Sequence, residues 1–98
     1  MYAMVQIVKL VPGTEEEMDV LLSKAAERNK KQKGFKGVVF FKSDKKNELG
    51  AIGIWETKED HDAHYAAYSQ EEIEFMQSST AEVIVQGGYR VIDEASVI

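Results

Sequence analysis

The chain contains no cysteine, and this absence excludes disulfide bonds, thiolate catalysis and cysteine-ligated zinc. It also lacks any apolar run close to the roughly 18 residues that a membrane span requires. Its 12 basic residues are outnumbered by 17 acidic ones, and the formal net charge of −5 disfavours nucleic acid and anionic membrane surfaces, which both bind basic faces. The N-terminus has neither the basic segment nor the cleavage site of a signal peptide, so we expect a cytoplasmic protein.

Proline is almost as rare as cysteine, and the single proline, Pro12, forms a turn signal with Gly13. No repeat, linker or low-complexity segment divides the chain, so its 98 residues are expected to form one domain over residues 1–98. A chain of this length buries only a modest fraction of its surface, and a partner subunit would therefore add to its stability.

Four stretches are rich in β-branched and aromatic residues, as is typical of strands. They cover residues 2–11, 35–42, 48–56 and 81–93. A polar loop at 43–47 is expected to join the second strand to the third as a hairpin. Two adjacent glycines, Gly87 and Gly88, predict a β-bulge in the fourth strand.

A first helix is predicted from Thr14, because Thr14 and Glu17 have the spacing of a capping box. Its last turn, at residues 28–33, is basic, and Gly34 follows as the residue expected just beyond the helix end. One apolar stripe recurs along this helix at helical spacing, formed by Met18, Leu21, Leu22, Ala25 and Ala26.

A second helix is predicted from Thr57, an N-cap with Asp60 at the third helical position, to about Tyr68. Ser69 and Glu72 have the spacing of another capping box, so the helix is expected to break and restart there. The polar run 78–80 (SST) is expected to form a loop before the last strand.

The elements follow one another in the order β-α-β-β-α-β, which is the ferredoxin-like α+β arrangement of an antiparallel sheet with both helices on one face. Such a sheet should alternate apolar and polar residues, yet all four strands are apolar on both faces. In the second strand, Val38 and Phe40 oppose Val39 and Phe41. We therefore expect a homodimer formed through the open sheet face. The alternative is that these are simply exposed β-forming residues.

Residues 51–68 concentrate the groups that can hold an aromatic ligand and move a proton. They include the only tryptophan, both histidines and two of the four tyrosines, namely Trp55, His61, His64, Tyr65 and Tyr68. The last four share one helical stripe with Glu72. The opposite face carries the small residues Ala63, Ala66 and Ala67. The sequence leaves open which face turns toward the sheet.

An imidazole has an unperturbed pKa of roughly 6.5 and can take a proton from a phenol or an enol near neutral pH. Aromatic walls bind a planar substrate and exclude water. Gln6 lies within the apolar run of the first strand, where it can orient a ligand carbonyl or hydroxyl. The third strand carries small residues that leave space for a ligand, namely Gly50, Ala51 and Gly53.

Each of these features also has a simpler interpretation. The two histidines can be partly exposed helix residues, or can form a metal site together with Asp60 or Glu56. The tyrosine pair can pack in the core or at an interface. Gln6 can be an ordinary strand glutamine whose hydrogen bonds are satisfied.

The run from Ile54 to His64, IWETKEDHDAH, resembles the strand-to-helix segment of the antibiotic biosynthesis monooxygenase domain family. In that family an aromatic residue, often tryptophan, ends the third strand, an acidic-polar turn follows, and a small residue precedes a histidine on the helix. The matching positions here are Trp55, the turn 56–59, Ala63 and His64. The strand that runs to Pro12-Gly13 and the Gly34-Phe35 pair are similar as well.

The resemblance implies a dimeric α+β barrel with a pocket in each subunit between the sheet and the helices. Some members of the family are monooxygenases that oxidise phenols, anthrones or quinols to quinones with O₂ and need no metal or organic cofactor. On this basis His64 is the expected base, and His61 is its helper or substitute. The expected substrate-binding residues are Trp55, Gln6, Tyr65 and Tyr68.

Other relatives degrade haem with an asparagine on the first strand, a tryptophan on the second helix and a histidine further along it. Here Gln6 and His64 stand near the first two positions, and residues 71–76 contain no histidine, so haem degradation is disfavoured. Many members also carry a second histidine near the position of Ser69, which this chain lacks. A dimeric binding or regulatory module that holds a small aromatic or isoprenoid ligand without converting it is the main alternative to an enzyme.

Overall fold

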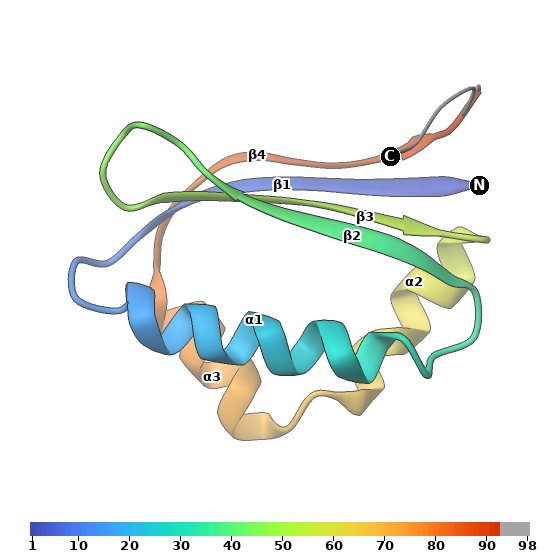
Figure 1. Cartoon of the computed structure of the whole chain (residues 1–98), viewed down its shortest axis with the longest axis horizontal. Coiled ribbons are helices and arrows are strands. Elements are labelled where there is room, and N and C mark those ends of the chain that lie inside the picture. The colour runs from blue at the N-terminus through green and yellow to red at the C-terminus, as the bar shows by residue number, and fades with distance from the viewer. Residues whose placement is uncertain (93–98) are drawn as a thin grey trace.

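The computed structural model describes residues 1–92, and its four strands form a single antiparallel sheet (Figure 1). The strands lie in the order β2-β3-β1-β4, which confirms the ferredoxin-like α+β arrangement. Their bounds are β1 (Tyr2–Leu10), β2 (Phe35–Lys42), β3 (Glu48–Trp55) and β4 (Thr80–Arg90). Position 93, where we expected the last strand to end, lies outside the described residues.

The helices all lie on one side of this sheet (Figure 1). They are α1 (Glu15–Asn29), α2 (Lys58–His64), a 3-10 turn η1 (Tyr65–Ala67) and α3 (Gln70–Ser79). Figure 1 shows α1 and α3 below the sheet, with α2 at the end where β3 finishes. None of the helices within residues 1–92 is both long and apolar enough to cross a lipid bilayer.

Two of the three predicted helix caps are confirmed. The Thr57 hydroxyl accepts a hydrogen bond from the Asp60 amide at 3.0 Å. Ser69 and Glu72 form a complete capping box, in which each side chain accepts from the other residue's amide, so the helix restarts where expected. The capping box predicted at Thr14 is wrong, because the Thr14 hydroxyl instead donates to the Val11 carbonyl at 2.7 Å.

Two helix ends differ from the prediction. The α1 helix ends at Asn29, and irregular turns carry the chain on to Gly34, whose φ of +80° is the left-handed conformation that favours glycine. The loop predicted at 78–80 is wrong, because α3 runs through Ser79 directly into β4. The Thr80 hydroxyl donates to the Met76 carbonyl at 2.8 Å and so satisfies one of the last carbonyls of α3.

The β-bulge predicted at Gly87 and Gly88 is also wrong. Both glycines pair in regular register with β1, and the irregular pairing lies further back along β4, opposite residues 7–10. A Cβ atom built on Gly88 would lie 1.7 Å from the Tyr2 hydroxyl. Glycine at this position therefore makes room for the Tyr2 side chain.

The two faces of the sheet have different surroundings. One faces the helices, and its aliphatic core is formed by Val8, Leu10, Met18 and Leu49. No helix within residues 1–92 covers the other face. That bare face presents apolar side chains that are one-third to almost two-thirds exposed, namely Val39, Ile52, Val85 and Tyr89.

Candidate active site

A cavity of about 130 Å³ lies between the sheet and the helices, at the end of the sheet where β3 finishes. It brings together all six residues predicted from the sequence, namely Gln6, Trp55, His61, His64, Tyr65 and Tyr68. A second cavity of about 100 Å³ adjoins it, and the two share Gln6, Leu22, Phe40, Ala51 and Met76 as lining residues.

The aromatic face of α2 turns inward, which settles the question that the sequence left open. His61 and His64 are only 3% and 6% exposed, whereas Ala63 on the opposite side is exposed. Trp55, the last residue of β3, is 2% exposed and packs against both imidazoles. The two imidazoles are therefore buried groups in an aromatic cluster and not surface residues of the helix.

His64 is held as a neutral imidazole. Its Nδ1 faces the His61 carbonyl oxygen, which can only accept, so Nδ1 carries the proton. Burial lowers the pKa of His64 from its usual range, and the hydrogen bond to the His61 carbonyl opposes this only in part. Nε2 then keeps its lone pair, and no group within residues 1–92 bonds to it. A neutral imidazole with this free nitrogen in a cavity can accept a proton from a ligand.

Aromatic rings fix the plane of the His64 imidazole. The Trp55 ring stacks on it with centroids 4.6 Å apart and an interplanar angle of 30°. The Tyr65 ring lies 4.1 Å away, and the Tyr68 ring meets it edge-on at 5.7 Å. These contacts limit the rotation of the imidazole, so its Nε2 keeps a fixed direction.

His61 is oriented by a carboxylate. Its Nδ1 lies 2.9 Å from Oδ1 of Asp62, which can only accept, so Nδ1 again carries the proton. The ammonium group of Lys58 donates to the same carboxylate at 2.7 Å. These bonds, that from Lys58 first, lower the pKa of Asp62 and keep it ionised. His61 Nε2 is left facing the Tyr65 hydroxyl at 3.5 Å, a long contact.

The two tyrosines are protonated donors near neutral pH. Partial burial raises the pKa of both Tyr65 and Tyr68 above the usual value, and Tyr65 remains 44% exposed. The Arg28 guanidinium lies 4.5 Å from the Tyr68 ring centroid. Its Nη1 also donates to both carboxylate oxygens of Glu72, at 3.1 and 3.2 Å. This cation–π contact links the cavity wall to α1.

The sequence analysis missed Asn29, the last residue of α1. Its side chain is 6% exposed and lines the cavity, and its Oδ1 is buried without a hydrogen-bond partner. A signal was present, because Asn29 follows Ala25 by four residues and so falls on the apolar stripe of the helix. A polar residue on a buried stripe indicates either a satisfied core group or a binding site.

The geometry does not support the metal site considered from the sequence. Within residues 1–92, no three metal-ligating side chains come together. The Glu56 carboxylate pairs with Lys36 at 3.1 Å. The Asp60 carboxylate packs against Gly34. Neither carboxylate therefore joins the two imidazoles.

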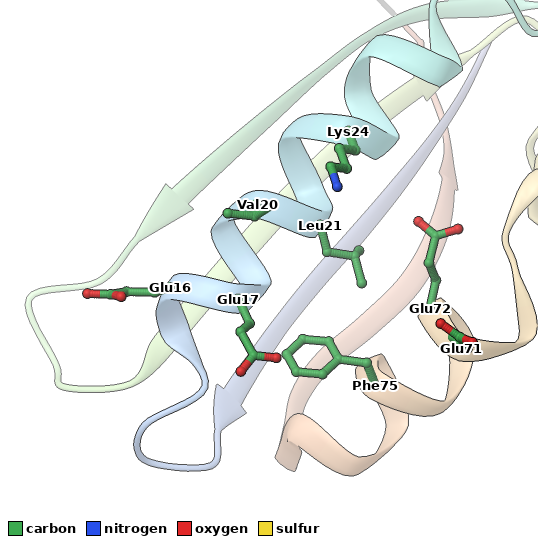
Figure 2. Close-up of a pocket in the computed structure, with 8 residues that line it drawn as sticks. All are labelled: Glu16, Glu17, Val20, Leu21, Lys24, Glu71, Glu72 and Phe75. Atoms are coloured by element: carbon green, nitrogen blue, oxygen red, sulfur yellow. The ribbon is translucent and has the colours of Figure 1, made fainter.

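A larger hollow, of about 760 Å³, lies between α1 and α3 and opens widely to solvent (Figure 2). Its apolar floor is Val20, Leu21 and Phe75, and its rim carries Glu16, Glu17, Lys24, Glu71 and Glu72. The four glutamates lie in the first turns of their helices, where the helix dipole favours acidic residues. The groove contains no buried base, so we place the candidate site in the smaller cavity.

No protein-family model matches the chain, and no curated protein matches it either. Solved structures match it over nearly its whole length. A Chloroflexus aurantiacus J-10-fl protein named as an antibiotic biosynthesis monooxygenase has 16% identity and a TM-score of 0.80, over 94% of this chain and 93% of that one. A Nitrosomonas europaea protein of the same name has 16% identity and a TM-score of 0.79, over 95% and 100%.

A third similar structure is SnoaB, a cofactor-independent oxygenase from Streptomyces nogalater. It has 15% identity to this chain and a TM-score of 0.76, and the match covers 94% of this chain and 93% of SnoaB. At such identities the likeness establishes the fold. The chain therefore has the fold of the antibiotic biosynthesis monooxygenase domains, which confirms the resemblance seen in its sequence at that level.

Proposed function

We propose that the protein is a cofactor-independent monooxygenase that oxidises a small aromatic substrate of the phenol, quinol or anthrone type with O₂. The observation that carries the proposal is His64, a buried neutral imidazole whose Nε2 is unpaired in an aromatic-walled cavity. The shared fold with SnoaB, a cofactor-independent oxygenase, supports the same reaction class.

In the proposed reaction, His64 Nε2 takes the proton of the substrate hydroxyl. The resulting phenolate is electron-rich and supplies electrons to O₂. One oxygen atom becomes a new ring carbonyl, and the other leaves as water with two hydrogens from the substrate. For a simple phenol the products are a quinone and one water, and the substrate provides all four electrons that O₂ accepts. The proton on His64 returns to the departing oxygen.

The other cavity residues have supporting roles in this proposal. Trp55 holds the plane of His64 and forms the wall on which the substrate ring packs. His61 is a secondary proton carrier, kept in one tautomer by Asp62. Gln6, Tyr65 and Tyr68 provide hydrogen-bonding groups for the substrate oxygens or the developing anion.

The test is O₂ uptake by purified protein that is free of metal and flavin, with single-ring quinols and anthrones as substrates. Turnover should fall about 10²- to 10⁴-fold in His64→Gln, since general-base catalysis contributes roughly this much. Lys24→Gln, an exposed change on α1, is the matched control. Unchanged turnover in His64→Gln would remove His64 from the mechanism. Saturable binding without any product would favour the ligand-binding module, and a Soret band on haem addition would favour a haem protein.

We also propose that the active protein is a cytoplasmic homodimer joined through the bare sheet face. Val39 and Tyr89 are 62% and 55% exposed on this face, and such apolar surface is expected to be covered. Sedimentation equilibrium should give a dimer, and Val39→Asp should shift it toward monomer because a carboxylate would be buried at the interface. If the wild-type protein is a monomer at micromolar concentration, the dimer proposal would be contradicted and the monooxygenase proposal would be unaffected.

A further inference from the structure

The Asn29 side chain carries a buried oxygen, Oδ1, that no part of the described chain satisfies. Asn29 is the last residue of α1 and lies on the stripe that packs toward the sheet. Its Oδ1 is buried and has no hydrogen-bond partner within residues 1–92. Buried polar groups in native proteins are nearly always paired, so an exception at a cavity wall indicates a missing partner.

The chemistry of that partner follows from the carboxamide. The group offers one acceptor oxygen and two N–H donors, and the assignment of oxygen and nitrogen can be exchanged without moving the side chain. In either orientation it can bond a hydroxyl or a carbonyl oxygen on a ligand. It offers nothing specific to a ligand that is purely hydrocarbon.

The size of the cavity suits a single aromatic ring. It measures about 130 Å³, with a neighbour of about 100 Å³. A dry protein cavity of roughly 150 Å³ is known to accept benzene. One aromatic ring therefore fits beside Trp55 and His64.

We infer that Asn29 anchors the ring oxygen of a single-ring hydroxyarene, a phenol or a quinol, and so selects oxygenated rings over plain hydrocarbons. This rests on the proposed function and narrows its substrate class. Asn29 comes from α1, and His64 comes from α2. The ligand oxygen is thus recognised from α1, a helix that carries none of the site residues predicted from the sequence.

Phenol and toluene, which have the same size, are the probes. Binding to the full chain can be followed by the fluorescence of Trp55, the only tryptophan, which lies in the cavity wall. Wild-type protein should bind phenol about two- to tenfold more tightly than toluene, the effect of one net hydrogen bond. In Asn29→Leu, a change of similar volume, this preference should disappear, whereas Lys24→Leu on the exposed side of α1 should retain it.

A second measurement uses the wild-type chain and does not depend on the folding of a variant. The side-chain amide resonances of Asn29 should shift when phenol saturates the protein, and should move much less with toluene. An unchanged phenol-to-toluene ratio in Asn29→Leu, no movement of these resonances, or no binding of phenol would each overturn the inference. Binding through Asn29 without turnover would disprove the monooxygenase and leave the inference standing. If the protein turns substrate over and Asn29→Leu does not alter that turnover, the inference about Asn29 would be disproved and the monooxygenase would stand.

Discussion

The interface between the helices and the sheet buries different types of side chain at its two ends. At one end Val8, Leu10, Met18 and Leu49 form a core, with Leu22, Phe75 and Met76 packed against it. At the other end the buried groups are Trp55, two imidazoles and the Asn29 carboxamide, with an unpaired oxygen among them. Buried unpaired polar atoms cost stability, so they are expected where they serve a ligand. The comparison indicates that the aliphatic end maintains the fold, and it places the proposed chemistry at the aromatic end.

The sharpest test of this division is Leu10→Ala at the aliphatic end. Leu10 is 3% exposed, and its truncation should lower the free energy of unfolding by about 2–5 kcal/mol, measured by urea denaturation. Val20→Ala, at a site 56% exposed, should stay within about 0.5 kcal/mol of wild type. Phenol affinity of the folded Leu10→Ala protein should be unchanged, and a loss would show that the two ends are coupled.

Asp62→Ala probes how His61 is positioned at the aromatic end. Without the carboxylate, the imidazole should become a mixture of tautomers, visible in its ¹⁵N chemical shifts, and turnover should fall by about tenfold or less. Lys58→Ala removes the other partner of Asp62 and serves as the control. If the His61 shifts in Asp62→Ala match those of wild type, Asp62 does not set the tautomer.

His64→Phe asks whether the imidazole is there for packing. A phenyl ring keeps the stacking on Trp55 but loses the hydrogen bond to the His61 carbonyl, so the free energy of unfolding should fall by about 1–3 kcal/mol. Turnover should nevertheless be lost. A large destabilisation with retained turnover would show that His64 serves packing and not the proposed reaction.

The pH dependence of stability should report the buried state of His64. Its pKa is lowered in the folded protein, so below its ordinary value of about 6.5 the unfolded chain binds a proton that the folded chain refuses. Stability should therefore fall as the pH drops from 6.5 to the lower folded pKa, and this contribution should be constant above 6.5. Urea midpoints in this window should vary less in His64→Phe than in wild type. Identical slopes would contradict the assignment.

What the sequence could predict was set by local interactions. The caps at Thr57 and Ser69 and the restart of the helix depend on residues three positions apart, and they were correct. The Thr14 cap failed because its hydroxyl found a competing carbonyl in the preceding turn. Which face of α2 turns inward depends on how the helix packs against the sheet, so helical spacing alone could not predict the buried face.

Contacts between distant segments were out of reach for the same reason. Gly88 was taken as a bulge because its sequence neighbours do not include Tyr2, the side chain for which it makes room. The cavity residues on α2 could be predicted because they are rare side chains concentrated in one stretch. Asn29 was missed because it stands alone on another helix, although its place on the apolar stripe would have revealed it.

The break between α2 and α3 has a consequence for how this fold can diversify. Each helix has its own N-cap, Thr57 for the first and Ser69 for the second, so each can begin independently of the other. The first carries the histidines of the cavity. The second contributes Phe75 and Met76 beside the aliphatic core, and of these only Met76 also lines the cavity. Mutations that reshape the cavity wall can therefore accumulate in one helix while the other continues to support folding. A lineage of such proteins can explore new ligands at little risk to the stability of the domain.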